Sequence, residues 1–175
     1  MKLKTILHTG LTVSNLDKSV EFYQDVLGLD LIFRVDDRAP GWNNDYIGRL
    51  VGIPNAELRE AWLALGDHVV ELVEYLSPKG QSTSQTRPND VGNVHVCFLV
   101  DDIEAAYKEL SAKGVRFAGP PPKVAEGERA GVSGIYMWDP DGHNIELLYY
   151  PPGISIETYR RMWSEKQRLA RDSES

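Results

Sequence analysis

The chain has 175 residues, 42% of them hydrophobic, which suits one domain or two small ones around an ordinary buried core. Its formal net charge of −7 argues against nucleic-acid binding, which needs a basic face. The single cysteine, Cys97, excludes an internal disulfide and favours a reducing cytoplasm, and the absence of a run of about 20 apolar residues predicts a soluble protein without membrane contact.

The first half of the chain predicts a strand, a helix and further strands, in that order. A strand is predicted over 6–13, and a helix over 15–28, where apolar residues recur at helical spacing and a glycine follows. Two more strands are predicted over 56–65 and 68–76, with turn residues between them.

An insertion, 34–55, interrupts this half before its last two strands. It contains Trp42, Tyr46 and Ile47 among several polar residues. We expect the insertion to cap the functional site and to select the substrate, whereas a plain surface loop is the alternative.

The second half repeats the first after a linker rich in Ser, Pro, Gly and polar residues, 77–90. A strand is predicted over 93–100, a helix over 101–114, and strands over 134–140 and 144–150. A terminal helix and tail, 152–175, should pack on the body or on a neighbouring subunit.

The repeat is clearest at the end of each half. The phrase HVVELVEY begins at His68 and HNIELLYY begins at His143. Internal similarity of this kind indicates duplicated structural units. We therefore predict one domain, 1–151, of class α+β, built from module one, 2–76, and module two, 91–150.

Strand alternation places four polar residues on one kind of face. Side chains along a strand point alternately to opposite faces, so His8, Glu71, His95 and Glu146 lie opposite the apolar face that should pack under the helices. Burying two imidazoles and two carboxylates without partners is costly, and a shared divalent cation removes that cost. We predict these four residues as metal ligands.

The remaining histidines and the cysteine have simpler interpretations. His68 and His143 fall on the opposite face, next to turns, and are predicted to be structural. Cys97 shares the ligand face but is predicted to be a small apolar wall residue.

The two modules resemble the vicinal oxygen chelate superfamily, which includes glyoxalase I, methylmalonyl-CoA epimerase and extradiol dioxygenases. The resemblance rests on LHTGLTVSNLDKSVEFYQDVLGL, VHVCFLVDDIEAAYKELSAKGV and DPDGHNIEL. It implies two βαβββ modules whose mixed sheets curl into a cup around one divalent metal ion, and it implies the same four ligands. The metal is left open among Zn, Ni, Co, Mn and Fe.

The resemblance also implies a chemistry. Family members use the metal to stabilise a developing enolate, and a carboxylate moves the proton, which serves isomerisation, epimerisation or lyase reactions. Glu146 is the favoured base and Glu71 the other candidate. Thr12 stands where bacterial glyoxalase I has an arginine that helps hold glutathione, so the resemblance does not carry glutathione use.

Two other functions stay open. An iron-dependent extradiol-type dioxygenase needs two histidines and one glutamate, and Glu71 as a fourth ligand argues against it. A small-molecule or antibiotic-binding resistance protein is the second alternative, against which the complete ligand set argues. The family resemblance implies a small-molecule substrate and a homodimer.

Overall fold

The computed structural model describes residues 1–36, 44–81 and 87–173, and it contains two modules that share the order strand, helix and three strands, with η1 and α2 added in module one. The elements of module one are β1 (His8–Thr12), α1 (Leu16–Glu21), η1 (Phe22–Val26), β2 (Asp30–Val35), α2 (Asn44–Val51), β3 (Glu57–Leu65) and β4 (His68–Ser77). Those of module two are β5 (His95–Leu99), α3 (Ile103–Ala112), β6 (Arg116–Phe117), β7 (Ser133–Trp138) and β8 (Asn144–Tyr149), and α4 (Ile156–Ser173) follows.

Each module forms one four-stranded mixed sheet. The strand orders are β1-β4-β3-β2 and β5-β8-β7-β6, so the first strand of each module lies beside its last. These first and last strands run parallel, whereas the other neighbours are antiparallel. The α+β class with two like modules is thus confirmed, and the modules remain two separate sheets rather than a closed barrel.

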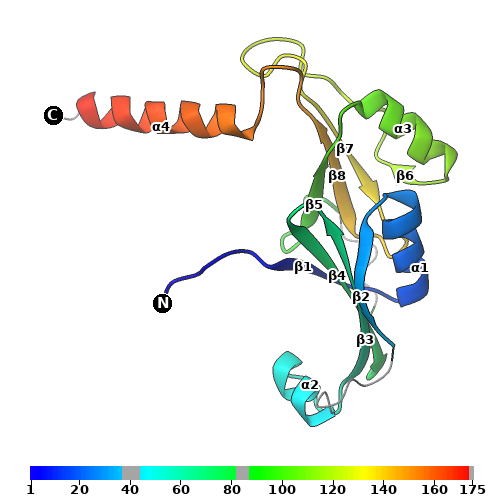
Figure 1. The fold of residues 1–175 in the computed structure, drawn as a ribbon. Coiled ribbons are helices and arrows are strands. Elements are labelled where there is room, and N and C mark those ends of the chain that lie inside the picture. Colours follow the sequence, from blue (N-terminus) through cyan, green and yellow to red (C-terminus); the bar gives the residue numbers. More distant parts are fainter. Residues whose placement is uncertain (37–43, 82–86, 174–175) are drawn as a thin grey trace.

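The helices α1 and α3 begin and end with matching signals. Asn15 and Asp102 cap them, each accepting a backbone N–H from three residues further on with its side chain. Gly28, after η1, which continues α1, and Gly114, after α3, have φ of 80° and 84°, a left-handed conformation that glycine adopts without strain. Both helices lie on the same side of the molecule, which leaves the opposite side of the strands uncovered (Figure 1).

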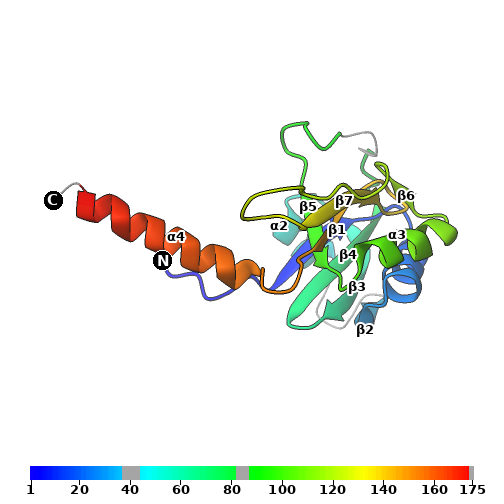
Figure 2. The same cartoon turned by 90° about the horizontal axis from the view of Figure 1, so that it is seen from above.

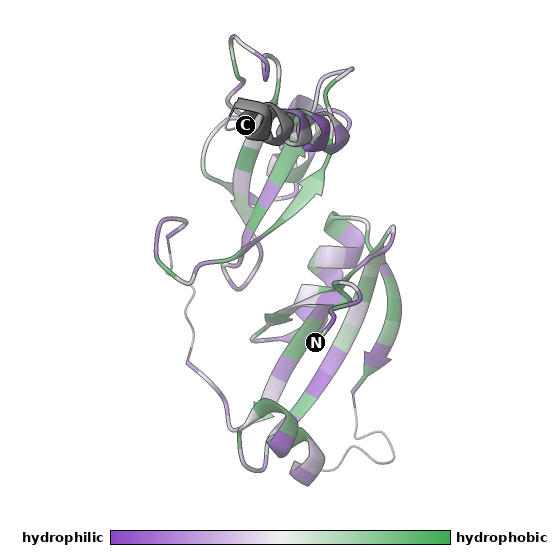
Figure 3. Cartoon of the chain, turned by 90° about the vertical axis from the view of Figure 1, so that its left-hand side faces the viewer, coloured by the Kyte–Doolittle hydropathy of each residue, from purple (hydrophilic) through white to green (hydrophobic). Residues whose placement is uncertain are grey.

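One hydrophobic core extends through both modules. It contains fully buried residues of the first sheet, such as Leu63 and Leu72, together with Met137 and Ile145 of the second. Figure 3, which looks at the molecule from the left-hand side of Figure 1, shows hydrophilic and hydrophobic residues alternating along the strands. This alternation sends one set of side chains to the core and the other to the uncovered side.

Polar contacts also join the modules. The hydroxyl of the buried Tyr23 donates to Asp139, at 3.2 Å, and the backbone N–H of Ser14 donates to Asp141, at 2.9 Å. Asp139 also accepts from the backbone and the ring of His143, so this aspartate organises the turn between β7 and β8. The turn is therefore held against η1 and against the segment between β1 and α1 of module one.

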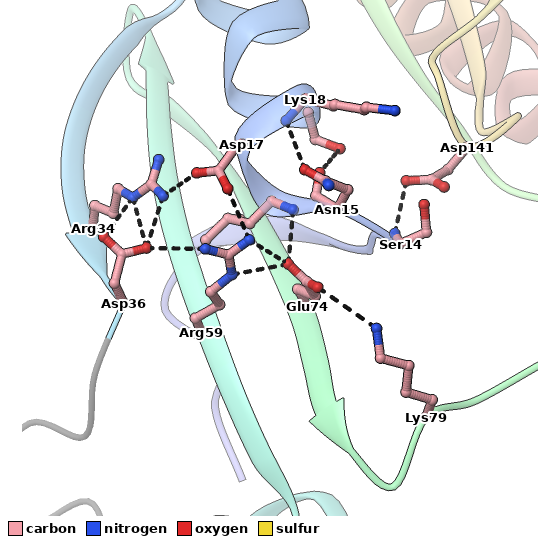
Figure 4. Close-up of polar contacts among 12 residues, drawn as sticks. Ser14, Asn15, Asp17, Lys18, Arg34, Asp36, Arg59, Glu74, Lys79 and Asp141 are labelled. Carbon is pink, nitrogen blue, oxygen red and sulfur yellow. Dashed lines mark hydrogen bonds and ion pairs between the residues drawn. The ribbon is translucent and has the colours of Figure 1, made fainter.

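An ion-pair network stabilises the helix side of module one (Figure 4). Arg59 contacts Asp17 and the buried Glu74, both at 2.9 Å, and Arg34 contacts Asp17 and Asp36. Glu74 also accepts the backbone N–H of Leu16, which fixes the start of α1 on β4. The hydrogen bonds that Arg34 and then Arg59 donate to Asp17 lower the pKa of the Asp17 carboxyl.

The terminal helix α4 extends away from both sheets, as does the N-terminal segment (Figures 1 and 2). Its first turns contact the body through Tyr159, whose ring lies 5.8 Å from that of Tyr150. Helix α4 therefore does not pack along the body of its own chain. Packing against a neighbouring subunit, the other expectation, stays a prediction. None of the described helices is long and apolar enough to cross a membrane.

The predicted insertion contains a helix that the sequence did not indicate. Helix α2 buries Ile47 and exposes Tyr46, and it lies at the end of module one that is remote from module two (Figure 1). Residues 37–43, including Trp42, lie outside the described part of the chain. The role of the insertion as a cap stays a prediction.

Candidate metal centre

The first predicted ligand pair lies on β1 and β4. Parallel pairing sets Gly10 opposite Glu71, which brings the Glu71 carboxylate beside His8 on the same face. His8 Nε2 and Glu71 Oε2 are 3.3 Å apart, and both side chains are partly exposed. The other ring nitrogen of His8, Nδ1, is buried and has no hydrogen-bond partner among the described residues.

The second pair repeats this arrangement on β5 and β8. Cys97 is set opposite Glu146, and His95 Nε2 lies 3.2 Å from Glu146 Oε2. The His95 and Glu146 side chains are 41% and 25% exposed, so both can reach a ligand from solvent. The duplicated phrase of the sequence therefore has a duplicated structural result, one His–Glu pair for each module.

An aromatic residue stands across from each glutamate. Trp62 of β3 pairs with Glu71, and Tyr136 of β7 pairs with Glu146, at equivalent places in the repeat. Their rings lie 5.4 Å from His8 and 5.2 Å from His95. We had not predicted either aromatic residue, although each precedes its glutamate on the neighbouring antiparallel strand and alternates onto the same face.

The two aromatic residues interact differently with the glutamates opposite them. The Trp62 indole N–H donates to Glu71 Oε1, at 3.1 Å, which leaves Oε2 facing His8. For Tyr136, burial and then the negative charge of Glu146 raise the pKa of the hydroxyl, so it stays protonated at neutral pH. Glu71 is held by a fixed donor, and Glu146 lies beside a neutral phenol.

Glycines leave room for both carboxylates. A Cβ on Gly10 would lie 3.2 Å from Glu71 Oε2, and one on Gly134 would lie 3.3 Å from Glu146 Oε1 and 3.1 Å from a Leu148 methyl group. Such contacts are tighter than ordinary packing. A larger residue at either position would press on the carboxylate.

A further carboxyl group, Glu60, lies near the first pair and was not predicted. It is 5% exposed, and it follows the alternation of β3 two residues before Trp62. Burial and then the charge of Glu71 raise the pKa of its carboxyl, against the opposing effect of His8. Its counterpart in module two, by strand register, is Gly134.

The other histidines and the cysteine have contacts of their own. His68 Nε2 lies 3.0 Å from the Thr9 hydroxyl, and His143 Nδ1 lies 2.8 Å from Asp139, as expected of structural residues beside turns. Partial burial, and then the charge of Glu146, raise the pKa of the Cys97 thiol to about 12. A protonated thiol suits a wall residue better than a ligand.

The geometry of each pair fits two ligands of one ion. Zinc binds imidazole nitrogen and carboxylate oxygen at about 2.0 to 2.2 Å, and tetrahedral coordination then separates two ligand atoms by roughly 3.4 Å. The observed separations, 3.3 and 3.2 Å, lie near this value. Within the described residues, however, no group of three or more His, Cys, Asp or Glu side chains comes together at a site that could hold a metal. The structure thus brings His8 to Glu71 and His95 to Glu146, but does not bring the four together in one chain.

Comparison with protein families gives a match over most of the chain. Residues 5–147 match the model of the Glyoxalase/Bleomycin resistance protein/Dioxygenase superfamily. A 2-epi-5-epi-valiolone epimerase from Actinomyces sp. is 35% identical over 153 residues, which cover 86% of this chain and 81% of the relative. A lactoylglutathione lyase from Neisseria meningitidis is 30% identical over 161 residues, which cover 89% of this chain and 97% of that protein.

Solved structures show the same fold. A glyoxalase family protein from Bacillus cereus superposes with a TM-score of 0.71 at 24% identity, over 86% of this chain and 96% of that one. A fosfomycin resistance protein from Listeria monocytogenes superposes with a TM-score of 0.57 at 18% identity, over 86% and 97% of the two chains.

Proposed function

Because the chain belongs to the Glyoxalase/Bleomycin resistance protein/Dioxygenase superfamily, we propose that it is a divalent-metal-dependent isomerase or lyase that moves a proton next to a carbonyl group. Relatives named as an epimerase and as lyases support an enzyme of this kind. The observation that carries the proposal is the pair of His–Glu sites at equivalent register positions on the uncovered faces of both sheets.

The metal site is proposed to form between two copies of the chain. Each module offers two donors, whereas a metal ion needs more, and the described residues of one chain do not supply a third donor at either pair. The exposed residues Ile6 and Leu7, just before β1, and Leu99 of β5 lie near the two pairs and can be buried by a partner. In a two-fold dimer, His8 and Glu71 of one copy would face His95 and Glu146 of the other.

The residues then divide the work of proton transfer. A divalent ion, when bound, supplies electrophilic stabilisation to negative charge that develops on substrate oxygen. Glu146 takes the proton from the carbon next to the carbonyl group, and the electron pair of the broken C–H bond moves onto the carbonyl oxygen. Delivery of a solvent proton to the other face of that carbon inverts the centre, and transfer of the proton from Glu146 to the neighbouring carbon isomerises the substrate.

Trp62 and Tyr136 have different roles in these steps. Trp62 holds the Glu71 carboxylate by one oxygen, so Glu71 acts as a fixed ligand. The protonated Tyr136 hydroxyl can donate to a substrate oxygen beside Glu146.

The test measures metal content and deuterium incorporation together. Purified protein should contain one divalent ion per chain, which is two ions per dimer. With 2-epi-5-epi-valiolone or lactoylglutathione as candidate substrates in deuterated water and without oxygen, deuterium should enter substrate or product. Turnover that depends strictly on oxygen, with a catechol as substrate, would contradict the proposal.

A further inference from the structure

We propose that a pocket beside Glu146 binds an acidic group of the substrate, a carboxylate or a phosphate ester, through Lys123 and Arg129. The inference rests on the proposed function, because it names the class of substrate that reaches the same glutamate. It concerns a segment of module two that the metal ligands do not involve.

The pocket has a volume of about 300 Å³ and lies on the uncovered face of β7 and β8. Glu146 and Tyr136 line it together with Lys123 and Arg129. Two cationic side chains therefore share one small space with the proposed base.

The cations are held by backbone structure rather than by a free loop. Lys123 forms a β-bridge with Ser133 at the start of β7, and the backbone N–H of Val124 donates to the carbonyl of Val132, at 2.8 Å. The Ser133 hydroxyl donates to the carbonyl of Pro122, at 2.6 Å. This segment, part of the yellow-green loop at the top of Figure 1, thus continues the sheet as a short hairpin.

Lys123 and Arg129 form no ion pair with another described residue, and Glu146 is the one carboxylate among the residues that line their pocket. By contrast, Arg34 and Arg59 of module one bind aspartates. Arg129 instead lies over the ring of Tyr159, 5.5 Å from its centroid, which anchors the guanidinium without neutralising it. In a protein of net charge −7, two unpaired cations in one pocket point to an anionic ligand.

The rest of the pocket strengthens the binding of an anionic ligand and fixes its orientation. Val132 and Leu148 give it apolar walls, which screen charges less than water does. Glu146 repels an anion, so the acidic end of the substrate must lie toward Lys123 and Arg129. The carbonyl end then lies toward Glu146, which is the orientation that proton transfer requires.

The test compares two probes that share the same hydroxyketone group, dihydroxyacetone and dihydroxyacetone phosphate. On the metal-loaded full chain, calorimetry should show that the phosphate ester binds about tenfold or more tightly, the scale of one charge-assisted contact. The double variant Lys123→Met, Arg129→Met should lose this excess and keep its affinity for dihydroxyacetone. The control Lys108→Met, on the exposed surface of α3, should keep both affinities. Rising salt should reduce only the excess.

The outcomes separate this inference from the proposed function. Equal affinities for the two probes, no binding of the ester, or an excess that survives the double variant would overturn the anion site. An excess that depends on Lys123 and Arg129 while neither probe responds to loss of the metal supports the anion site and contradicts the proposed function. Competition by inorganic phosphate or by acetate distinguishes the two kinds of acidic group.

Discussion

At the scale of single residues, the two glutamates of the repeat are not equivalent. Glu71 accepts from the Trp62 indole, whereas Glu146 lies beside a protonated phenol and a protonated thiol. A carboxylate fixed by a donor is suited to hold a metal. We therefore propose Glu146 as the residue that transfers the proton.

Glutamine at each position tests this assignment. Glu146→Gln keeps a carbonyl oxygen for the metal but cannot accept a proton, so turnover should fall by roughly 10²–10⁴-fold while metal stays bound. Glu71→Gln should be milder, because its amide oxygen can still accept from Trp62. Metal content and turnover are measured on both variants. An inactive Glu71→Gln protein beside an active Glu146→Gln protein, both with metal, would reverse the assignment.

The Trp62 hydrogen bond should be visible in metal affinity. Trp62→Phe keeps an aromatic ring and removes the N–H that orients Glu71. Loss of such an orienting contact typically weakens metal binding by about 10- to 100-fold, and metal titration should show a change of this size. Tyr136→Phe is the matched control, because it occupies the equivalent place in module two. Equal metal affinities in the wild type and Trp62→Phe would show that the bond does not position Glu71.

At the scale of secondary structure, the turn between β7 and β8 links the modules through charge. The His143 ring is partly desolvated, which lowers its pKa, but the hydrogen bond and the charge of Asp139 outweigh this effect and raise the pKa overall. Asp139 in turn accepts from Tyr23 of module one. Protonated His143 should therefore stabilise the junction.

This pair predicts a pH-dependent contribution to the free energy of unfolding. Because the folded-state pKa of His143 is raised, its stabilisation is fully present below the ordinary histidine pKa of about 6.5 and is lost as pH rises through the folded-state value. His143→Gln should thus destabilise the protein more at pH 5.5 than at pH 9 in urea unfolding. In an Asp139→Asn background the difference between the two pH values should disappear. A loss from His143→Gln that is the same at both pH values would contradict the ion pair.

The sequence predicted elements with strong periodicity better than irregular ones. The helix predicted over 15–28 forms, and Asn15 begins it, but its second half is the π-helical η1, which no spacing rule indicated. Helix α2 arises inside the insertion, where burial of Ile47 outweighs the local polar composition. The first strand was predicted over 6–13, yet β1 begins only at His8, and Leu7 is exposed.

The site was predictable only in part, for a physical reason. Alternation along a strand assigns a side chain to a face, and strand order within a module brings His8 to Glu71. Neither pattern contains the distance between two sheets. The sequence therefore could not predict whether the two His–Glu pairs meet within one chain or between two chains. The set of four metal ligands itself stays a prediction.

At the scale of the whole molecule, a site shared between two copies predicts complementation. Take one variant with His8→Ala and Glu71→Ala, and another with His95→Ala and Glu146→Ala, each expected to be inactive alone. In a mixed dimer one of the two sites would receive both intact pairs, so a random mixture should regain about a quarter of the wild-type activity. Activity and metal content are measured after co-refolding the two variants. If one chain forms the whole site, mixing restores nothing.

If the proposed metal dependence holds, the placement of β1 and β5 at sheet edges determines when an ion can bind. Each edge strand has only the last strand of its own module as a neighbour, so His8 meets Glu71, and His95 meets Glu146, only after that module has been synthesised to its end. A ribosome-bound chain, or a lone subunit under the proposed pairing, then offers two protein donors at a time, which hold a divalent ion weakly. Under the proposed pairing, the identity of the metal would be decided late, by the ions that finished subunits encounter when they assemble, and not by those present during translation.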